Sequence, residues 1–168
     1  MRLKRSTGRL TRGGVALVAL ASVLALLAAG CSSNSSSSGG GTNYSVFVQK
    51  FRYHGMPSSI PSGNFTIAFS NHENLPITNE MVVVSLPSGK SSQDVISAAK
   101  TGGTASEDRW LHFGEIGDVN TGATIAGVFD LPAGNYVFAC WQTGNLGKPD
   151  AKGKPHAARG MVFPFTVT

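Results

Sequence analysis

The stretch "LPAGNYVFACW", residues 131–141, decides which fold the sequence predicts. Its second part, "NYVFACW" (135–141), is rich in the β-branched and aromatic residues that favour strands. A similar run, "ATIAGVFDL" (123–131), comes directly before it, and Pro132 and Gly134 stand between the two runs. The sequence therefore predicts two strands joined by a tight connection.

Further runs of the same kind flank this pair. Four more strands are predicted, namely "YSVFVQKF" (44–51), "NFTIAFSN" (64–71), "EMVVVSLP" (80–87) and "MVFPFTVT" (161–168). Pro164 indicates an edge position or a bulge in the last of them. One helix is predicted over 91–100, where Ser91 and Asp94 have the spacing of an N-terminal capping box. Short strands with Gly/Pro turns indicate an all-β sandwich or Greek-key barrel with one short helix.

The N-terminal part of the chain predicts export. Residues 1–30 combine a basic leader with an uncharged apolar run, which is the pattern of a signal peptide. The run ends in "LLAAGC", which resembles the lipobox of bacterial lipoproteins, and this resemblance implies that Cys31 carries the lipid. An ordinary secretory signal is the alternative. Residues 31–43 then form a Ser/Gly-rich tether, and residues 44–168 form the single folded domain.

The charge of the chain changes when the leader is removed. The full sequence has 14 Lys and Arg against 9 Asp and Glu, and five of the cations lie in the leader, so 14 − 5 = 9 cations balance 9 acids. A neutral domain gives no reason to expect nucleic-acid binding. The sequence also contains no Gly-x-Ser-x-Gly, His-Glu-x-x-His or phosphate-binding glycine motif, so we expect no enzymatic activity.

With Cys31 lipidated, Cys140 has no cysteine partner in the chain. An unpaired cysteine outside the cytoplasm is either buried and inert or a metal ligand. The loop after it carries Lys148, Lys152, Lys154 and Arg159. This loop is either a solvated surface or a docking surface for an acidic partner.

The segments "LPAGNYVFAC…H…GMVFPFTV" and "GNFTIAFSNHENLPITNEMVVVSL" resemble the cupredoxins, the plastocyanin-like and azurin-like blue-copper proteins. The resemblance implies a cupredoxin-like Greek-key β-sandwich that binds copper and transfers one electron at a time. It assigns Cys140 as the thiolate ligand, His156 as an imidazole ligand and Met161 as the axial thioether. A blue-copper site takes one thiolate, two imidazoles and a weak axial ligand.

Two features depart from the cupredoxin pattern. Asn79 stands where the first imidazole is usual, and fifteen residues separate Cys140 from His156. His72 is the nearest histidine that could replace the missing ligand, and His54 and His112 are further candidates. Three functions remain open: electron transfer, Cu(I) carriage without blue-copper geometry, and a non-redox surface binding module. The ligand set favours weak or Cu(I)-selective binding over a strong blue centre.

Replacement of Cys31 by Ser should release the protein from membranes. Two or three acyl chains anchor a protein far more firmly than one chain does, and the variant has no site for them. Fractionation of cells into membrane and soluble parts measures the effect. A variant that still sediments entirely with the membranes would contradict the lipid anchor.

Overall fold

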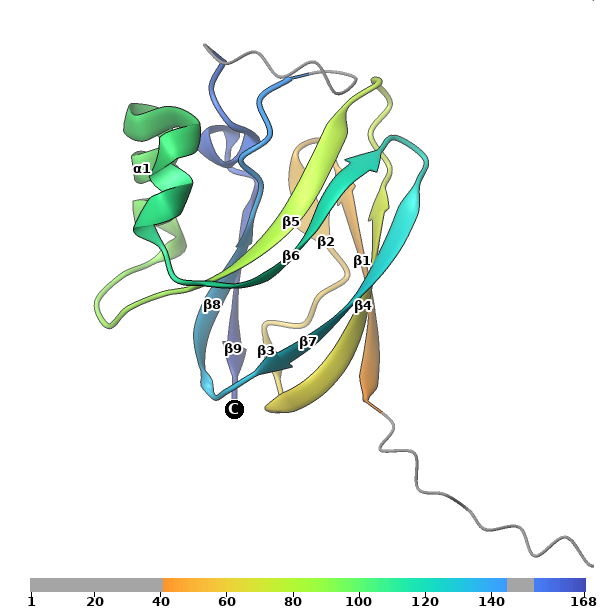
Figure 1. Ribbon diagram of the computed structural model, residues 1–168, viewed down its shortest axis with the longest axis vertical. Coiled ribbons are helices and arrows are strands. Elements are labelled where there is room, and N and C mark those ends of the chain that lie inside the picture. Colours follow the sequence, from red (N-terminus) through yellow and green to blue (C-terminus); the bar gives the residue numbers. More distant parts are fainter. Residues whose placement is uncertain (1–40, 145–152) are drawn as a thin grey trace, which may run out of the picture. The chain divides into compact units, whose positions relative to one another are not determined.

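Figure 1 shows the computed structural model, which describes residues 41–144 and 153–168. The strands are β1 (Thr42–Gln49), β2 (Arg52–His54), β3 (Ser59–Ile60), β4 (Gly63–Asn71), β5 (Thr78–Ser85), β6 (His112–Asn120), β7 (Thr124–Leu131), β8 (Gly134–Ala139) and β9 (Val162–Val167). The helices are α1 (Ser92–Gly102) and the 3-10 helices η1 (Gly103–Arg109) and η2 (His156–Arg159). The predicted signal peptide and Cys31 lie outside the described residues. Within those residues, no helix is long and apolar enough to span a membrane.

The strands form two sheets that pack face to face. The four-stranded sheet has the order β2-β1-β4-β7, and the five-stranded sheet has the order β3-β9-β8-β5-β6. β1 pairs with β4 in parallel, β3 pairs with β9 in parallel, and the other neighbours are antiparallel. The predicted β-sandwich with one short α-helix is confirmed, and β1 begins two residues before the strand predicted at 44–51.

The alternation of residues in β4 and β5 explains how the sheets pack. In β4, Phe65, Ile67 and Phe69 are buried, while the residues between them are half-exposed. One face of such a strand lies on the core and the other lies toward solvent. β5 is buried on both faces, as its continuous apolar sequence predicts. Its residues Met81 and Val83 join the core between the sheets, because they point away from the helical layer.

A helical layer covers the other face of β5. Val82 and Val84 pack there with Val95 and Ala99 of α1. The predicted capping box is present at the start of α1, where the backbone N–H of Ser91 donates to the Asp94 carboxylate at 2.9 Å. This layer therefore buries apolar side chains that a two-layer sandwich would leave exposed.

The connection between β7 and β8 crosses from one sheet to the other. The Tyr136 hydroxyl donates to the Pro132 carbonyl oxygen at 2.9 Å, four residues upstream. A tyrosine bonded back to the backbone in this way secures the inter-sheet corner in other Greek-key sandwiches. The tight connection predicted at Pro132 and Gly134 is therefore an inter-sheet corner and does not form a hairpin within one sheet.

β6 was not predicted, for a physical reason. Its pairing with β5 is interrupted by two register shifts, one between Asn79 and Met81 and one between Val83 and Val84. A bulge adds one residue to a strand, so the buried residues Ile116 and Val119 are three positions apart instead of two. The alternation that signals a strand is therefore lost.

Three of the four sheet edges are short or irregular. β2 and β3 have three and two residues, and β6 carries Glu115, Asp118 and the two register shifts. β7 lies against β6 so closely that a Cβ atom at Gly127 would stand 2.8 Å from the Ile116 side chain. Only glycine fits at that position without displacing Ile116.

The two-residue turn between β1 and β2 has an unusual sequence. Lys50 and Phe51 have φ values of 52° and 55°, and Gln49 pairs with Arg52. Such turns favour Asn-Gly, because most side chains are strained at positive φ.

Replacement of Lys50 by Asn should raise the free energy of unfolding by about 1 kcal/mol, because asparagine adopts positive φ at lower cost. Urea denaturation of wild type and variant measures the difference. Replacement of Lys90 by Asn, outside the turn, serves as the control. An unchanged or lowered stability in the Lys50 variant would show that the turn is not strained.

Candidate metal centre

The neighbouring strands β5 and β8 bring Asn79 and Cys140 together. Asn79 is the second residue of β5, and Cys140 follows the last residue of β8. The two strands are antiparallel with Val82 opposite Ala139, so the start of β5 lies beside the end of β8. Both side chains are fully buried. Cys140 is thus held by the central ladder of the five-stranded sheet.

Met161 lies opposite Cys140 on the other side of β8. Ala139 pairs with Val162 in β9, and the strands are antiparallel. Met161, which precedes Val162, therefore lies across from Cys140, which follows Ala139. Met161 is fully buried and belongs to the same core cluster as Cys140. The sheet therefore brings a thiol and a thioether to one end of the sandwich.

The helix η2 returns His156 to this end despite the long loop. The backbone N–H of His156 donates to the Gln142 carbonyl at 2.9 Å, and that of Ala157 donates to the Cys140 carbonyl at 2.7 Å. The Met161 N–H in turn donates to the His156 carbonyl at 3.1 Å. These bonds tie η2 to the segment that follows β8, so the position of His156 does not depend on the intervening loop.

Three side-chain atoms converge in the buried space between these segments. The Cys140 Sγ is 3.4 Å from the His156 Nδ1, and that nitrogen is 2.8 Å from the Asn79 Oδ1. The Asn79 Oδ1 is also 3.9 Å from the Cys140 Sγ. The Asn79 Nδ2 is buried and has no hydrogen-bond partner among the described residues. Asn79 therefore occupies the position of the expected imidazole and forms a hydrogen bond with the remaining one.

The protonation of the two candidate ligands follows from their burial. Burial, and secondly the charge of Glu80, raises the pKa of the Cys140 thiol well above its ordinary value. Burial, and secondly the nearby Arg159, lowers the pKa of His156 to about 4. Near neutral pH the site therefore holds a thiol and a neutral imidazole whose Nδ1–H donates to the Asn79 Oδ1. Metal binding at Nδ1 would displace the thiol proton and require the imidazole proton to move to Nε2.

The geometry of Cys140 and His156 fits a shared metal ion. For metal–sulfur and metal–nitrogen bonds of about 2.3 and 2.0 Å, two tetrahedral ligands lie about 3.5 Å apart. The observed separation of 3.4 Å matches this value. The backbone N–H of Glu80 lies 3.5 Å from the Cys140 Sγ and would stabilise a thiolate. Asn79 fits less well, because its oxygen stands at hydrogen-bonding distance from His156.

Glu80 and Trp141 form a second set of contacts behind the site. The Trp141 backbone N–H donates to the Glu80 Oε1 at 2.6 Å, and the Gln142 side chain donates to the Oε2 at 3.2 Å. The Trp141 indole is buried and donates to the Ser106 hydroxyl at 3.0 Å. Trp141 thus packs in the helical layer, and Glu80 fixes the backbone that follows Cys140.

Phe51 covers the site from the solvent side, a role that no sequence signal indicated. Its ring lies edge-on to the His156 ring, with centroids 4.9 Å apart. The Arg159 guanidinium lies over the other part of the ring, 5.1 Å from its centroid. His156 is therefore screened from solvent by a half-buried aromatic ring.

The other histidines lie elsewhere. His54 and His72 are exposed and stack on Phe47, with centroid distances of 4.9 and 5.0 Å. The His112 Nε2 lies 3.3 Å from the Glu107 carbonyl oxygen. In residues 41–144 and 153–168, no three His, Cys, Asp or Glu side chains gather to hold a metal ion. The structure thus brings Cys140 and His156 together without His72, and the neighbouring groups are Met161 and Asn79.

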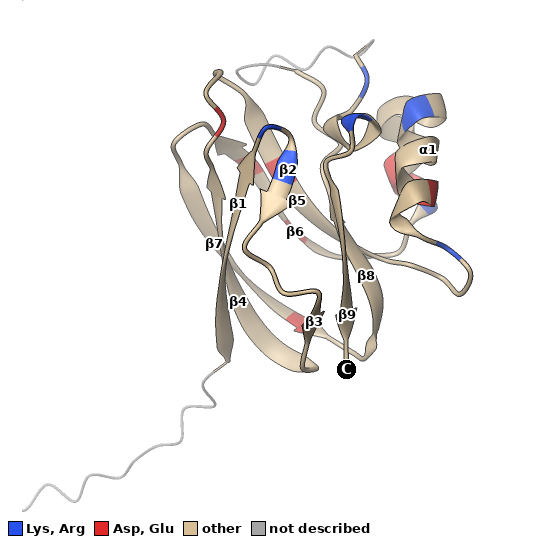
Figure 2. Ribbon diagram, turned by 180° about the vertical axis from the view of Figure 1, so that it is seen from behind, with Lys and Arg blue, Asp and Glu red and all other residues tan. Residues whose placement is uncertain are grey.

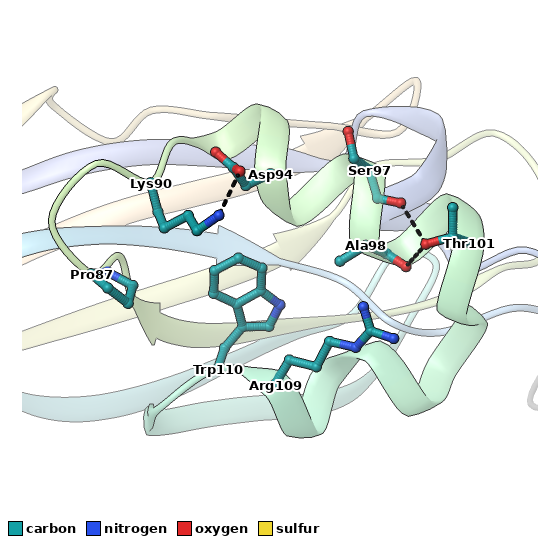
Figure 3. Close-up of a pocket in the computed structure, with 8 residues that line it drawn as sticks. All are labelled: Pro87, Lys90, Asp94, Ser97, Ala98, Thr101, Arg109 and Trp110. Carbon is teal, nitrogen blue, oxygen red and sulfur yellow. Dashed lines mark hydrogen bonds and ion pairs between the residues drawn. The ribbon is translucent and has the colours of Figure 1, made fainter.

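A separate cavity of about 450 Å³ lies beside α1 (Figure 3). It is lined by Pro87, Lys90, Asp94, Ser97, Ala98, Thr101, Arg109 and Trp110. Lys90 is paired with Asp94 at 3.1 Å. The residues of the candidate metal centre do not contribute to this cavity.

Comparison with solved structures identifies the class of fold. The reduced auracyanin of Roseiflexus castenholzii matches with a TM-score of 0.53 and 19% identity, covering 76% of this chain and 97% of that one. Auracyanin B matches with a TM-score of 0.52 and 20% identity, covering 76% and 88%. The chain has a cupredoxin-like fold, as its sequence predicts. No protein-family model and no curated protein sequence matches it.

The stability of the metal-free protein should depend on Glu80 in a defined pH window. Burial raises the pKa of Glu80 from 4.5 to about 7, against the effect of its hydrogen bonds. Between these values the folded protein holds the proton more firmly than the unfolded chain, so the free energy of unfolding falls as the pH rises. The free energy of unfolding should therefore fall by about 3 kcal/mol between pH 4.5 and 7, and Glu80→Gln should remove this fall.

Urea denaturation at a series of pH values tests this expectation. Asp130→Asn removes an exposed carboxylate from β7, in the other sheet, and provides the control. Parallel profiles for wild type and Glu80→Gln would show that Glu80 titrates normally.

Proposed function

We propose that this protein is a lipid-anchored, extracytoplasmic copper protein that binds Cu(I) through Cys140, His156 and Met161. The cupredoxin-like fold suggests a copper-binding electron-transfer module. The observation that carries the proposal is the 3.4 Å separation of the Cys140 Sγ and the His156 Nδ1 in a buried site next to Met161. This distance suits two ligands of one ion, and in the metal-free protein it is also that of a hydrogen bond between the thiol and the imidazole.

The chemistry of these side chains favours the reduced ion. Thiolate and thioether sulfur are soft ligands that select Cu(I), and one neutral imidazole completes a set of three. Cu(II) prefers more nitrogen and oxygen donors, and the amide oxygen of Asn79 is a poor substitute for an imidazole. We therefore expect Cu(I) to bind more tightly than Cu(II), which raises the reduction potential of the bound ion.

The contacts around each ligand define its role. Cys140 supplies the charge of the site once its proton is lost, and the Glu80 N–H lies toward its sulfur. His156 is neutral without any cost at physiological pH, since its pKa is about 4. Met161 directly precedes β9 and is fully buried in the core. These supports suit either electron transfer or Cu(I) carriage.

One observation favours a second function, a non-redox binding module that retains the fold. The Asn79 Oδ1 and the His156 Nδ1 already form a 2.8 Å hydrogen bond, which satisfies the imidazole without a metal. In this alternative, Cys140 is a buried core residue. The copper-binding experiment below distinguishes the two functions.

The purified protein should bind one Cu(I) in competition with a chromogenic Cu(I) chelator, and Cys140→Ser should abolish this binding. Cu(II) should give only a weak thiolate-to-copper absorption band. Asn79→His restores the second imidazole and should produce an intense blue band with Cu(II). His72→Ala, which removes the exposed histidine, is the control and should behave as the wild type.

Three outcomes would contradict the proposal. Absence of binding by either ion would favour the non-redox module. An intense blue band in the wild type would show that Asn79 does not weaken the Cu(II) site. Undiminished Cu(I) affinity in Cys140→Ser would place the copper elsewhere.

A further inference from the structure

The backbone of the β1–β2 turn is strained at Lys50 and Phe51. Lys50 and Phe51 both adopt positive φ, and for a bulky residue such as Phe51 this conformation is an outlier. Backbone strain of this kind persists only where surrounding contacts maintain it, and it is concentrated at functional sites. The contacts of Phe51 therefore indicate what the turn is for.

Phe51 is held by groups from two separate segments, the β4–β5 connection and η2. Its backbone N–H donates to the Glu73 carboxylate at 2.6 Å. Its ring meets the His156 ring edge-on, and the Arg159 guanidinium lies 5.1 Å from the ring centroid. The strained turn thus places an aromatic ring between the candidate copper ligand and solvent.

Exposed cations surround this ring. Lys50 and Arg52 flank Phe51 in the turn, and Arg159 stacks on it from η2; all three are exposed. Figure 2 shows the basic residues of the turn and of η2 at the same end of the sandwich. The nearby Glu73 is 8% exposed, and one of its oxygens accepts the Phe51 N–H. We call the surface formed by Lys50, Phe51, Arg52 and Arg159 the Phe51 rim.

We propose that the Phe51 rim is the docking surface for an acidic partner protein, which exchanges copper or electrons with the site beneath it. This inference rests on the proposed function, because it names the partner class of that same site. Protein interfaces characteristically have an aromatic centre with charged groups at the margin. Complementary carboxylates on the partner would accelerate encounter and orient it over Phe51.

The Phe51 rim lies at the end of the sandwich where β1 ends, since β1 runs from Thr42 to Gln49 over a length of about 25 Å. A half-buried aromatic ring among exposed cations favours a protein with surface carboxylates as the occupant of this rim.

A decaglutamate peptide serves as the carboxylate probe, titrated into the ¹⁵N-labelled, copper-free full chain and followed by NMR. We expect shifts concentrated in the amides of residues 50–52 and 159–160, which diminish as salt is added. The double variant Lys50→Glu with Arg52→Glu should weaken binding about tenfold or more. Lys90→Glu with Arg109→Glu makes the same change in charge at the cavity beside α1 and should leave binding unchanged.

Three results would overturn the proposal. The first is a set of NMR shifts centred on Lys90 and Arg109. The second is an equal loss of peptide affinity in the two double variants. The third is a decalysine peptide that shifts the same amides as decaglutamate. Vesicles of phosphatidylglycerol that perturb residues 50–52 more strongly than the peptide would assign the rim to a membrane instead. Because copper is absent throughout, failure here is independent of failure of the copper-binding experiment.

Discussion

The candidate copper site depends on the hydrogen-bonded ladder that places β8 between β5 and β9. This ladder fixes Asn79, Cys140 and Met161 on three adjacent strands, although 82 positions separate the first from the last (161 − 79). A slip of one residue in either pairing would turn the side chains of a strand to the opposite face of the sheet. The backbone bonds from η2 to Cys140 and Gln142 then add His156 to the same end. The ligands are therefore positioned by main-chain geometry, and the side chains need little freedom.

Asn79 shows most clearly that this site is not optimised for the stability of the protein alone. A buried N–H group without a partner costs about 1–3 kcal/mol, and within the described part of the chain the Asn79 Nδ2 is such a group. An apolar side chain at this position would avoid that cost, but it could not accept the hydrogen bond from His156. Local departures from good packing or hydrogen bonding are expected where a protein carries out its function. The amide thus orients the imidazole, and under the proposed function it would make the site less suited to Cu(II).

The strands that carry the ligands could be predicted because their patterns are strong and local. The sequence shows the alternation in β4 and the apolar run in β5. It also shows that Cys140 ends one predicted strand and that Met161 begins the next one. The return of His156 could not be predicted, because it depends on two backbone bonds across a fifteen-residue interval. The contacts of His72 with Phe47, and of Phe51 with His156, arise between segments that only the fold brings together. β6 was missed because its two register shifts remove the alternation that signals a strand.

The treatment of the sheet edges has a consequence for behaviour at high concentration. An exposed, regular edge strand is a template for pairing with another chain, which leads to aggregation. In the described part of the chain, two of the four edge strands have only two or three residues, and a third is bulged and carries acidic side chains. The fourth, β7, has eight residues and exposes Ile125 and Val128, so it is the edge most open to pairing with another chain. An insertion that lengthened β2 or β3 would create a second such edge.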